Sequence, residues 1–182
     1  WFVAKGDLDM CTALLECGAD ADELTFENRA PPLRIACETG HEHIASLLIN
    51  HGCDIHGLDE DGGFALYAAS QFGRAEVAAL LVDKGAKMDQ AMNDGSTPLY
   101  IACQHGRTEI AALLVDKGAK IDQSMNDGCT PLFMACQEGR LKIVALLVDK
   151  GAKMDQAKND GATPLFMACQ AGFLKVAALL VE

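Results

Sequence analysis

The chain repeats itself every 33 residues, and this period limits its fold more than any other feature. Three blocks align without gaps, and the middle one agrees with each neighbour at 23 of 33 positions: 61–93, 94–126 and 127–159. The flanking copies are less complete: a diverged 28–60, a truncated 160–182 and a partial 1–27. A period of this length indicates a solenoid in which each repeat packs on its neighbours. We therefore expect a single domain over residues 1–182.

The block 94–126 shows how each repeat begins. Asp94-Gly95 is a turn signal, Thr97 suits a helix N-cap, and Pro98 suits the first helical position. Gly106 is expected to end this short helix. Its apolar residues fall at helical spacing on one face: Leu99, Ala102 and Cys103.

A second helix is expected over 108–117, ended by Gly118 and followed by an extended, hairpin-like polar loop over 119–126. One side of this helix carries a row of residues at helical spacing: Ile110, Leu113, Leu114 and Lys117. Neither helix is long enough to be stable alone, and each has a single apolar face. The predicted fold is therefore an all-α helical-hairpin solenoid with short β-hairpin-like loops.

Two copies depart from this pattern at the helix start. Residues 31–33 read Pro-Pro-Leu and residues 64–66 read Phe-Ala-Leu, so both lack the Thr cap and the second also lacks the Pro. Losing such a cap typically costs about 1 kcal/mol. The helices beginning near Pro32 and Ala65 are therefore expected to open more easily than their capped counterparts, which begin near Pro98, Pro131 and Pro164.

The formal charge of −11 lies mostly in residues 1–60, which hold 12 acidic and 3 basic side chains. This sign repels phosphate backbones and anionic lipid, and no apolar run is long enough to span a membrane. Nucleic acid binding and membrane insertion are therefore not expected. The acidic segment either serves solubility or meets a basic surface on a protein partner.

The cysteines follow the repeat. Four share one repeat position, which Ser70 takes in the remaining copy: Cys37, Cys103, Cys136 and Cys169. Equivalent positions in adjacent repeats should lie about 10 Å apart, whereas a disulfide needs Cα atoms within about 7 Å, so packing is expected. The others form no CxxC motif: Cys11, Cys17, Cys53 and Cys129. We expect Cys129 to be exposed and oxidisable in its turn, and the whole pattern favours a reducing, intracellular and cytoplasmic location.

Candidate chemistry is weak throughout. Cys103 and His105 could suggest a thiol and its base, but sister repeats replace the histidine freely, by Phe72, Glu138 and Ala171. A group of histidines near Cys53 does not converge by spacing: His41, His43, His51 and His56. No glycine-rich phosphate loop is present. Neither a catalytic residue nor a metal or cofactor is predicted, and the chain is not expected to be an enzyme.

Recurring motifs identify a family resemblance. Thr-Pro-Leu at 97–99, 130–132 and 163–165, with Leu-Leu at 113–114, 146–147 and 179–180, resembles ankyrin repeats over essentially all 182 residues. The histidine that usually follows Thr-Pro-Leu in that family is replaced in every copy, by Arg34, Tyr67, Tyr100, Phe133 and Phe166. The resemblance therefore does not imply that histidine's hydrogen-bond network for this chain. The four aromatic rings either wedge between repeats in its place or anchor a partner.

The resemblance implies that a partner binds at hairpin tips and on the first helices. At the tips these positions are Asp61, Asn93, Asp94, Ser96, Asn126, Asp127, Asn159 and Asp160. On the first helices they are Glu38, Tyr67, Gln71, Phe72, Tyr100, Gln104, His105, Phe133, Gln137, Glu138 and Gln170. The glutamines among them form a predicted ladder at repeat spacing.

The expected function is a protein-interaction scaffold, monomeric within a longer chain. The chain begins with Trp1 rather than Met and stops inside a second helix, without a polar capping repeat, so flanking protein is expected. The alternative is that the array is a regulatory or targeting arm of a longer enzyme or channel whose active part lies outside these residues.

Overall fold

The computed structural model describes residues 2–23 and 30–181, and in these the chain is helical without a strand, as predicted. The described chain divides into two compact units, one ending at Lys87 and the other beginning at Met88. Each is treated by itself below. The single domain over residues 1–182 stays a prediction, and the predicted start of the 28–60 repeat lies outside the described residues.

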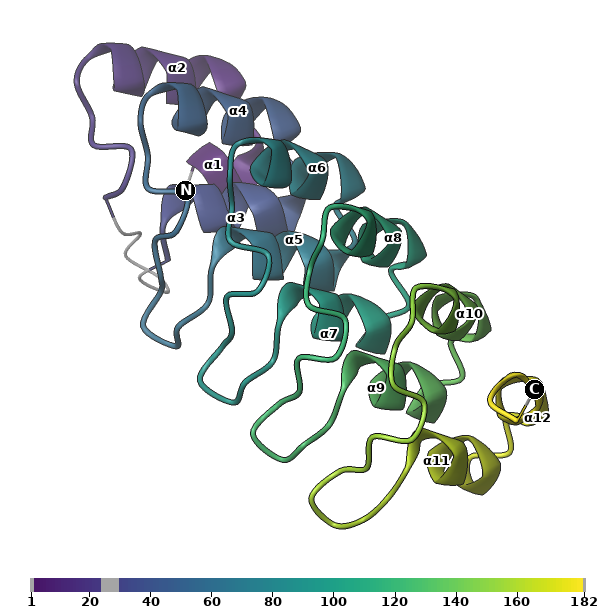
Figure 1. Ribbon diagram of the computed structural model, residues 1–182. Helices are drawn as coiled ribbons and strands as arrows, with labels where there is room; N and C mark the ends of the chain where they lie inside the picture. Colours follow the sequence, from purple (N-terminus) through teal and green to yellow (C-terminus); the bar gives the residue numbers. More distant parts are fainter. Residues whose placement is uncertain (1, 24–29, 182) are drawn as a thin grey trace. The chain divides into compact units, whose positions relative to one another are not determined.

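The first unit consists of helical hairpins in two layers (Figure 1). Its helices are α1 (Phe2–Lys5), α2 (Leu8–Glu16), α3 (Pro32–Thr39), α4 (Glu42–Asn50), α5 (Ala65–Phe72) and α6 (Ala75–Asp83). The odd-numbered helices pack side by side as one layer, and the even-numbered helices pack as the other.

The second unit repeats this arrangement with three hairpins. Its helices are α7 (Pro98–Gln104), α8 (Thr108–Asp116), α9 (Pro131–Gln137), α10 (Leu141–Asp149), α11 (Pro164–Gln170) and α12 (Leu174–Leu179). The first helices, α7, α9 and α11, pack against one another more extensively than the second helices do. Fully buried alanines allow this close approach of the first helices: Ala102, Ala135 and Ala168.

Helix starts in the second unit follow the sequence pattern. The hydroxyl oxygens of Thr97, Thr130 and Thr163 each accept a hydrogen bond from the backbone N–H three residues later, at 3.1–3.2 Å. In the first unit, Pro31 and Phe64 stand at the corresponding cap positions and make no side-chain cap bond. The predicted loss of two caps is confirmed.

Helix packing also agrees with the sequence, with one exception. Leu99, Ala102 and Cys103 are buried on one face of α7, and Ile110 and Leu114 are buried on α8. Lys117 does not join that face, because α8 ends at Asp116 and the exposed Lys117 follows it as the C-cap. The C-terminal boundary of this helix was therefore predicted one residue too far.

Serine can replace cysteine in this packing series without leaving a buried hydroxyl unsatisfied. Ser70 is fully buried in α5, and its hydroxyl donates to the backbone oxygen of Leu66 at 2.7 Å. A buried hydroxyl satisfied within its own helix behaves as a small side chain.

Candidate interaction surface

The first helices of the second unit end in glutamines at repeat spacing: Gln104, Gln137 and Gln170. The first two are half-buried and the third is exposed. No hydrogen bond engages their side-chain amides among the residues that the structure describes. These amides can therefore accept and donate hydrogen bonds outward, and the ladder that joins them stays a prediction. In the first unit, Gln71 is half-buried and its neighbour Phe72 is exposed.

Each hairpin tip of the second unit is a tight turn rather than a strand pair. Met92, Met125 and Lys158 each donate a backbone N–H to the oxygen four residues later, at 2.9 Å in every case. Inside each turn, an aspartate carboxylate accepts the N–H two residues on, at 2.8–3.0 Å: Asp94, Asp127 and Asp160. The aspartates are exposed, and one carboxylate oxygen of each shapes its turn. The other oxygen of Asp127 and of Asp160 pairs with Lys158 Nζ, at 3.1 and 3.8 Å.

Asparagines join these tips into a row. Asn126 Nδ2 donates to the backbone oxygen of Asn93 at 3.0 Å, and Asn159 Nδ2 donates to that of Asn126 at 3.2 Å. The backbone N–H groups of the same two residues donate to the oxygens of Asp94 and Asp127 at 2.9 Å. Every step between adjacent tips in this unit therefore carries two hydrogen bonds, and Figure 1 shows the loops following one another along one edge of the unit.

Three residues expected to contact a partner lie inside the fold instead. Ser96 is 2% exposed, Tyr100 5% and Phe133 2%. The Ser96 hydroxyl turns inward to Asp94 Oδ1 at 2.6 Å, and the two rings join an apolar cluster with Cys129 and Met134. This corrects the expectation for these residues, because groups so deeply buried offer a partner no surface.

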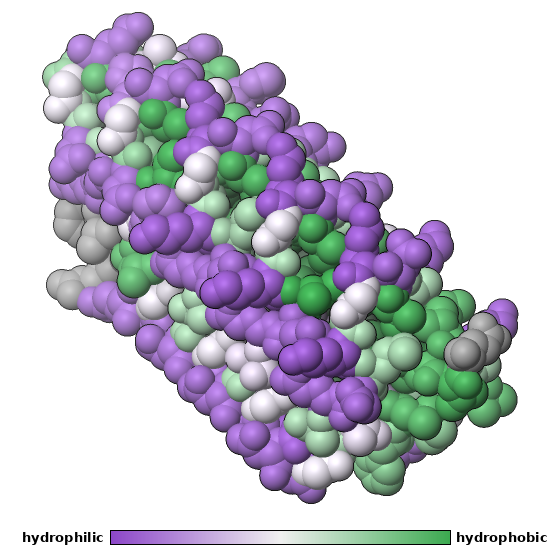
Figure 2. Space-filling view, in the orientation of Figure 1, coloured by the Kyte–Doolittle hydropathy of each residue, from purple (hydrophilic) through white to green (hydrophobic). Residues whose placement is uncertain are grey.

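The other two rings of the aromatic series behave differently. Tyr67 is half-buried, with its ring centroid 5.8 Å from that of Phe64. Phe166 is 54% exposed on α11. Figure 2 shows apolar surface over the last two helices, and the exposed apolar side chains there include Phe173, Leu174 and Val181.

The remaining predicted contact residues lie at or near the surface. The tip residues Asp61, Asn93, Asp94, Asn126, Asp127, Asn159 and Asp160 are exposed, as is His105. Glu138 is half-buried. Glu38 is half-buried in an ion pair with Arg34, whose Nη1 lies 3.4 Å from Glu38 Oε2.

The cysteine series packs as predicted, with two differences. Cys37, Cys103 and Cys136 are fully buried, whereas Cys169 is exposed on α11. Cys129 was expected to be exposed but is only 3% exposed. The turn folds its side chain inward against Tyr100, so the prediction of an oxidisable surface thiol is wrong.

The Cys103 and His105 pair has no catalytic geometry. Complete burial raises the pKa of the Cys103 thiol far above its ordinary value, so the nucleophilic thiolate does not form near neutral pH. His105 lies outside this core, and partial burial followed by the nearby Arg107 and Arg140 charges lowers its pKa. Within the described ranges, no three His, Cys, Asp or Glu side chains are grouped to hold a metal ion.

Sequence reasoning missed a set of arginines that link adjacent repeats. Arg74 Nε donates to the backbone oxygen of Glu38 at 3.1 Å in the first unit. Arg140 makes the equivalent bonds to Gln104 in the second unit. The signal was present as Gly-Arg at residues 73–74, 106–107 and 139–140, directly after a first helix.

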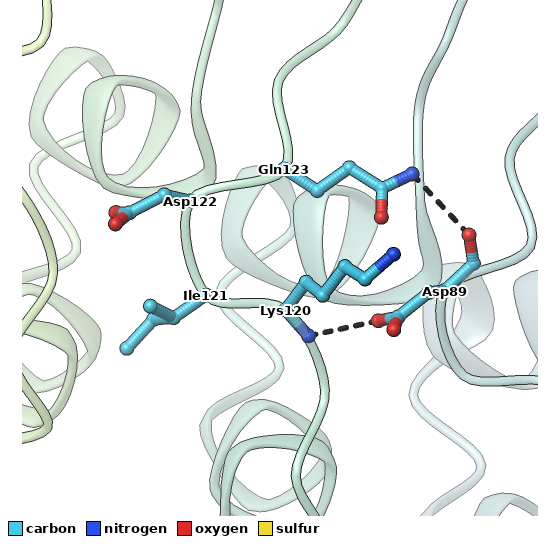
Figure 3. A pocket seen from close by; sticks show the side chains of 5 residues that line it. All are labelled: Asp89, Lys120, Ile121, Asp122 and Gln123. Atoms are coloured by element: carbon cyan, nitrogen blue, oxygen red, sulfur yellow. Dashed lines mark hydrogen bonds between the residues drawn. The ribbon is translucent and has the colours of Figure 1, made fainter.

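A shallow depression of about 510 Å³ lies at a junction of two loops in the second unit, lined by Asp89, Lys120, Ile121, Asp122 and Gln123 (Figure 3). The Asp89 carboxylate accepts a hydrogen bond from the backbone N–H of Lys120 at 2.8 Å. The backbone oxygen of Asp89 accepts one from Gln123 Nε2 at 3.3 Å. The same Asp-to-backbone bond joins Asp122 to Lys153 at 3.0 Å. The polar groups of this depression therefore tie consecutive loops together.

No helix in the described ranges has the length and apolar character needed to cross a bilayer.

Comparison with known families agrees with this geometry. A family model for ankyrin repeats, in three copies, matches residues 1–92, 53–125, 86–158 and 122–182, which together span the chain. No curated protein is matched by the chain. Ankyrin repeats are generally protein–protein interaction modules and are typically not enzymatic. The chain therefore belongs to the ankyrin-repeat family.

Proposed function

We propose that this chain is a protein-binding scaffold, and that a partner contacts the second unit at its hairpin tips and at the glutamine-bearing ends of its first helices. The observation that carries this proposal is the bonded row of tips. Its backbone groups are used to hold one tip to the next, while the Asp and Asn side chains at its edge remain exposed.

A surface that is ordered before binding loses little conformational entropy when a partner arrives, which favours affinity. The tip row meets this condition through its paired hydrogen bonds. The ladder of Gln104, Gln137 and Gln170 adds amide groups that both donate and accept. Together they suit an extended protein segment that crosses several repeats.

The first unit supplies a second, electrostatic contribution. Most acidic side chains in residues 1–60 are exposed where the structure describes them, among them Asp9, Glu16, Asp20, Glu42 and Asp54. A basic surface on the partner would complement them and would speed association at low salt. The same charge disfavours nucleic acid.

We further propose that binding is the whole activity of these residues, without catalysis, and that the chain works in a reducing, cytoplasmic environment. Cys37, Cys103 and Cys136 are buried, and burial raises the pKa of all three thiols. All eight cysteines are free, which a reducing compartment permits.

The test compares two faces of the second unit. The partner is first captured on the immobilised chain and identified, and its affinity for three purified proteins is then measured by calorimetry. These are the unaltered chain, a glutamine variant with Gln104→Ala and Gln137→Ala, and a control with Glu109→Ala and Lys142→Ala. The control residues are exposed on the second helices.

The glutamine variant should weaken binding by about tenfold or more, as expected when interface anchors are truncated, and the control should leave it unchanged. Unaltered affinity of the glutamine variant, or a loss confined to the control, would overturn the proposed surface.

A further inference from the structure

Two positions of the repeat face each other across adjacent repeats. One position is the third residue of the first helix of a repeat. The other lies 29 residues later, in the turn directly before the N-cap residue of the next repeat's first helix. Three such pairs lie within single units: Arg34 with Gly63, Tyr100 with Cys129, and Phe133 with Ala162. We call each of them a stacking pair.

The turn residue of the Arg34 pair is glycine. A Cβ atom on Gly63 would lie 3.0 Å from Arg34 Nε and 2.7 Å from Asp59 Oδ2, so a side chain there would displace the ends of these two paired side chains. Arg34 Nε lies 2.9 Å from Asp59 Oδ2, and Asp59 Oδ1 accepts the N–H of Gly63 at 2.6 Å. The turn therefore supplies a carboxylate for the guanidinium and the space to hold it.

The Tyr100 pair requires a polar partner of small size. Both side chains are buried in one cluster, which places the Cys129 thiol among the groups around Tyr100. The residue of this turn that corresponds to Asp59 is Met125, which packs against the same cluster. A buried hydroxyl costs free energy unless it finds a polar partner, and the Cys129 thiol is the polar group that the turn brings to this cluster.

The Phe133 pair is apolar. Phe133 lies in the same cluster, and Ala162 packs against that cluster together with Met167. Here the ring brings no polar atom, and the turn residue offers none in its side chain. In each of the three pairs, the turn thus matches the chemistry of the helix residue it faces.

We infer that the stacking pairs decide which repeat can pack on which, so that each first helix accepts a turn of matching chemistry and disfavours the turns of other repeats. Phe133 in place of Arg34 would leave Asp59 without its cation, and Arg34 in place of Phe133 would bury a guanidinium without a carboxylate. A charge buried without its counter-ion is strongly destabilising. The pairs therefore oppose slippage of the array by one repeat, which the near-identity of the repeats would otherwise permit.

The first test converts one pair into another with small changes. Tyr100→Phe and Cys129→Ala together reproduce the Phe133 and Ala162 pair one repeat earlier. Urea unfolding of the full chain is measured for both single variants and for the double variant. A matched control combines Tyr100→Phe with Cys136→Ala, a buried thiol outside the pair.

Cys129→Ala should lower the folding equilibrium constant about tenfold while the tyrosine is present, because the turn then brings no polar group to the cluster that holds the tyrosine hydroxyl. The same change should cost several-fold less in the Tyr100→Phe background. In the control, the effects of Tyr100→Phe and Cys136→Ala on the free energy of unfolding should simply add. Equal costs of Cys129→Ala in both backgrounds would overturn the inference for this pair.

The second test transplants the charged pair. Phe133→Arg is introduced into the unaltered chain and into a chain that carries Lys158→Asp and Ala162→Gly, which copy Asp59 and Gly63. The substitution should destabilise the first protein severely, to the point of unfolding, and should be tolerated far better in the second. If Phe133→Arg shifts the unfolding midpoint equally in both, or unfolds both, the turn does not select the helix residue and the inference fails.

Discussion

The guanidinium of Arg140 reaches back one repeat to the backbone oxygen of Gln104, which accepts bonds from Nε at 3.3 Å and from Nη2 at 3.1 Å. That oxygen belongs to the last residue of α7, where the helix dipole places partial negative charge. Gly106 allows the approach, because a Cβ atom there would lie 3.1 Å from the arginine side chain. One side chain thus satisfies the backbone oxygen at the end of a helix and joins two repeats.

Arg140→Met should lower the free energy of unfolding by about 1 kcal/mol, since it leaves the Gln104 carbonyl without its charged donor in a partly exposed site. Arg140→Lys should recover only part of this, because lysine lacks the planar fork. Urea unfolding measures both. Lys142→Met, at an exposed position of α10, is the control. An Arg140→Met effect no larger than that of the control would show that the bridge contributes nothing.

Amide hydrogen exchange should distinguish the capped first helices from the uncapped ones. Without a side-chain cap, α3 and α5 should open more readily than the threonine-capped α7, α9 and α11. Restoring a cap at Phe64 is not a clean test, because Phe64 is itself buried. Removing one is cleaner, and Thr130→Ala should cost about 1 kcal/mol. Slower exchange over residues 65–72 than over 98–105 would contradict the prediction.

Thiol alkylation should separate surface cysteines from buried ones. In native protein, iodoacetamide at pH 8 should modify Cys17 and Cys169, which are exposed, well before Cys103 or Cys129. Burial raises the pKa of Cys129 to about 11, so its thiolate is scarce at this pH. In denaturing urea all eight should react, which serves as the control. Native-state modification of Cys129 as fast as that of Cys17 would disprove its burial.

Acid should weaken the turn over residues 125–129. The Asp127 carboxylate accepts the Cys129 N–H at 2.9 Å and pairs with Lys158 Nζ at 3.1 Å, and these contacts lower its pKa below the ordinary 3.8. A carboxylate with a lowered folded-state pKa stabilises the fold above its unfolded pKa, and this contribution is lost as pH falls through the folded value. Stability measured by urea unfolding should therefore decline below about pH 3.8.

In Asp127→Asn that acid-dependent part of the decline should shrink, because the titrating group is gone. Asp155→Asn, at an exposed loop position, is the control. If stability falls at low pH in Asp127→Asn as it does in the unaltered chain, other groups cause the loss.

Local rules were sufficient to predict most of the fold. The Thr97-Pro98 start, the Gly106 stop and the apolar spacing around Cys103 each act within one repeat, so a single block predicted them correctly. The burial of Cys37, Cys103 and Cys136 followed because their repeat position packs between helices, although Cys169 at the same position of α11 is exposed.

The candidate surface was harder to predict because burial there depends on the neighbouring repeat. Cys129 and Ser96 stand in polar turns and look exposed in sequence, yet each turn folds its side chain inward. Tyr100 and Phe133 lie on the first-helix side expected to meet a partner, but they are covered within the unit. No pattern within one repeat shows which side chains the next repeat covers.

The row of tips in the second unit has a mechanical consequence. Asn126 and Asn159 each bind the preceding tip through one side-chain and one backbone bond. A load that separates two neighbouring tips would have to break one side-chain bond and one backbone bond, so the resistance of the row to opening is similar from one tip to the next.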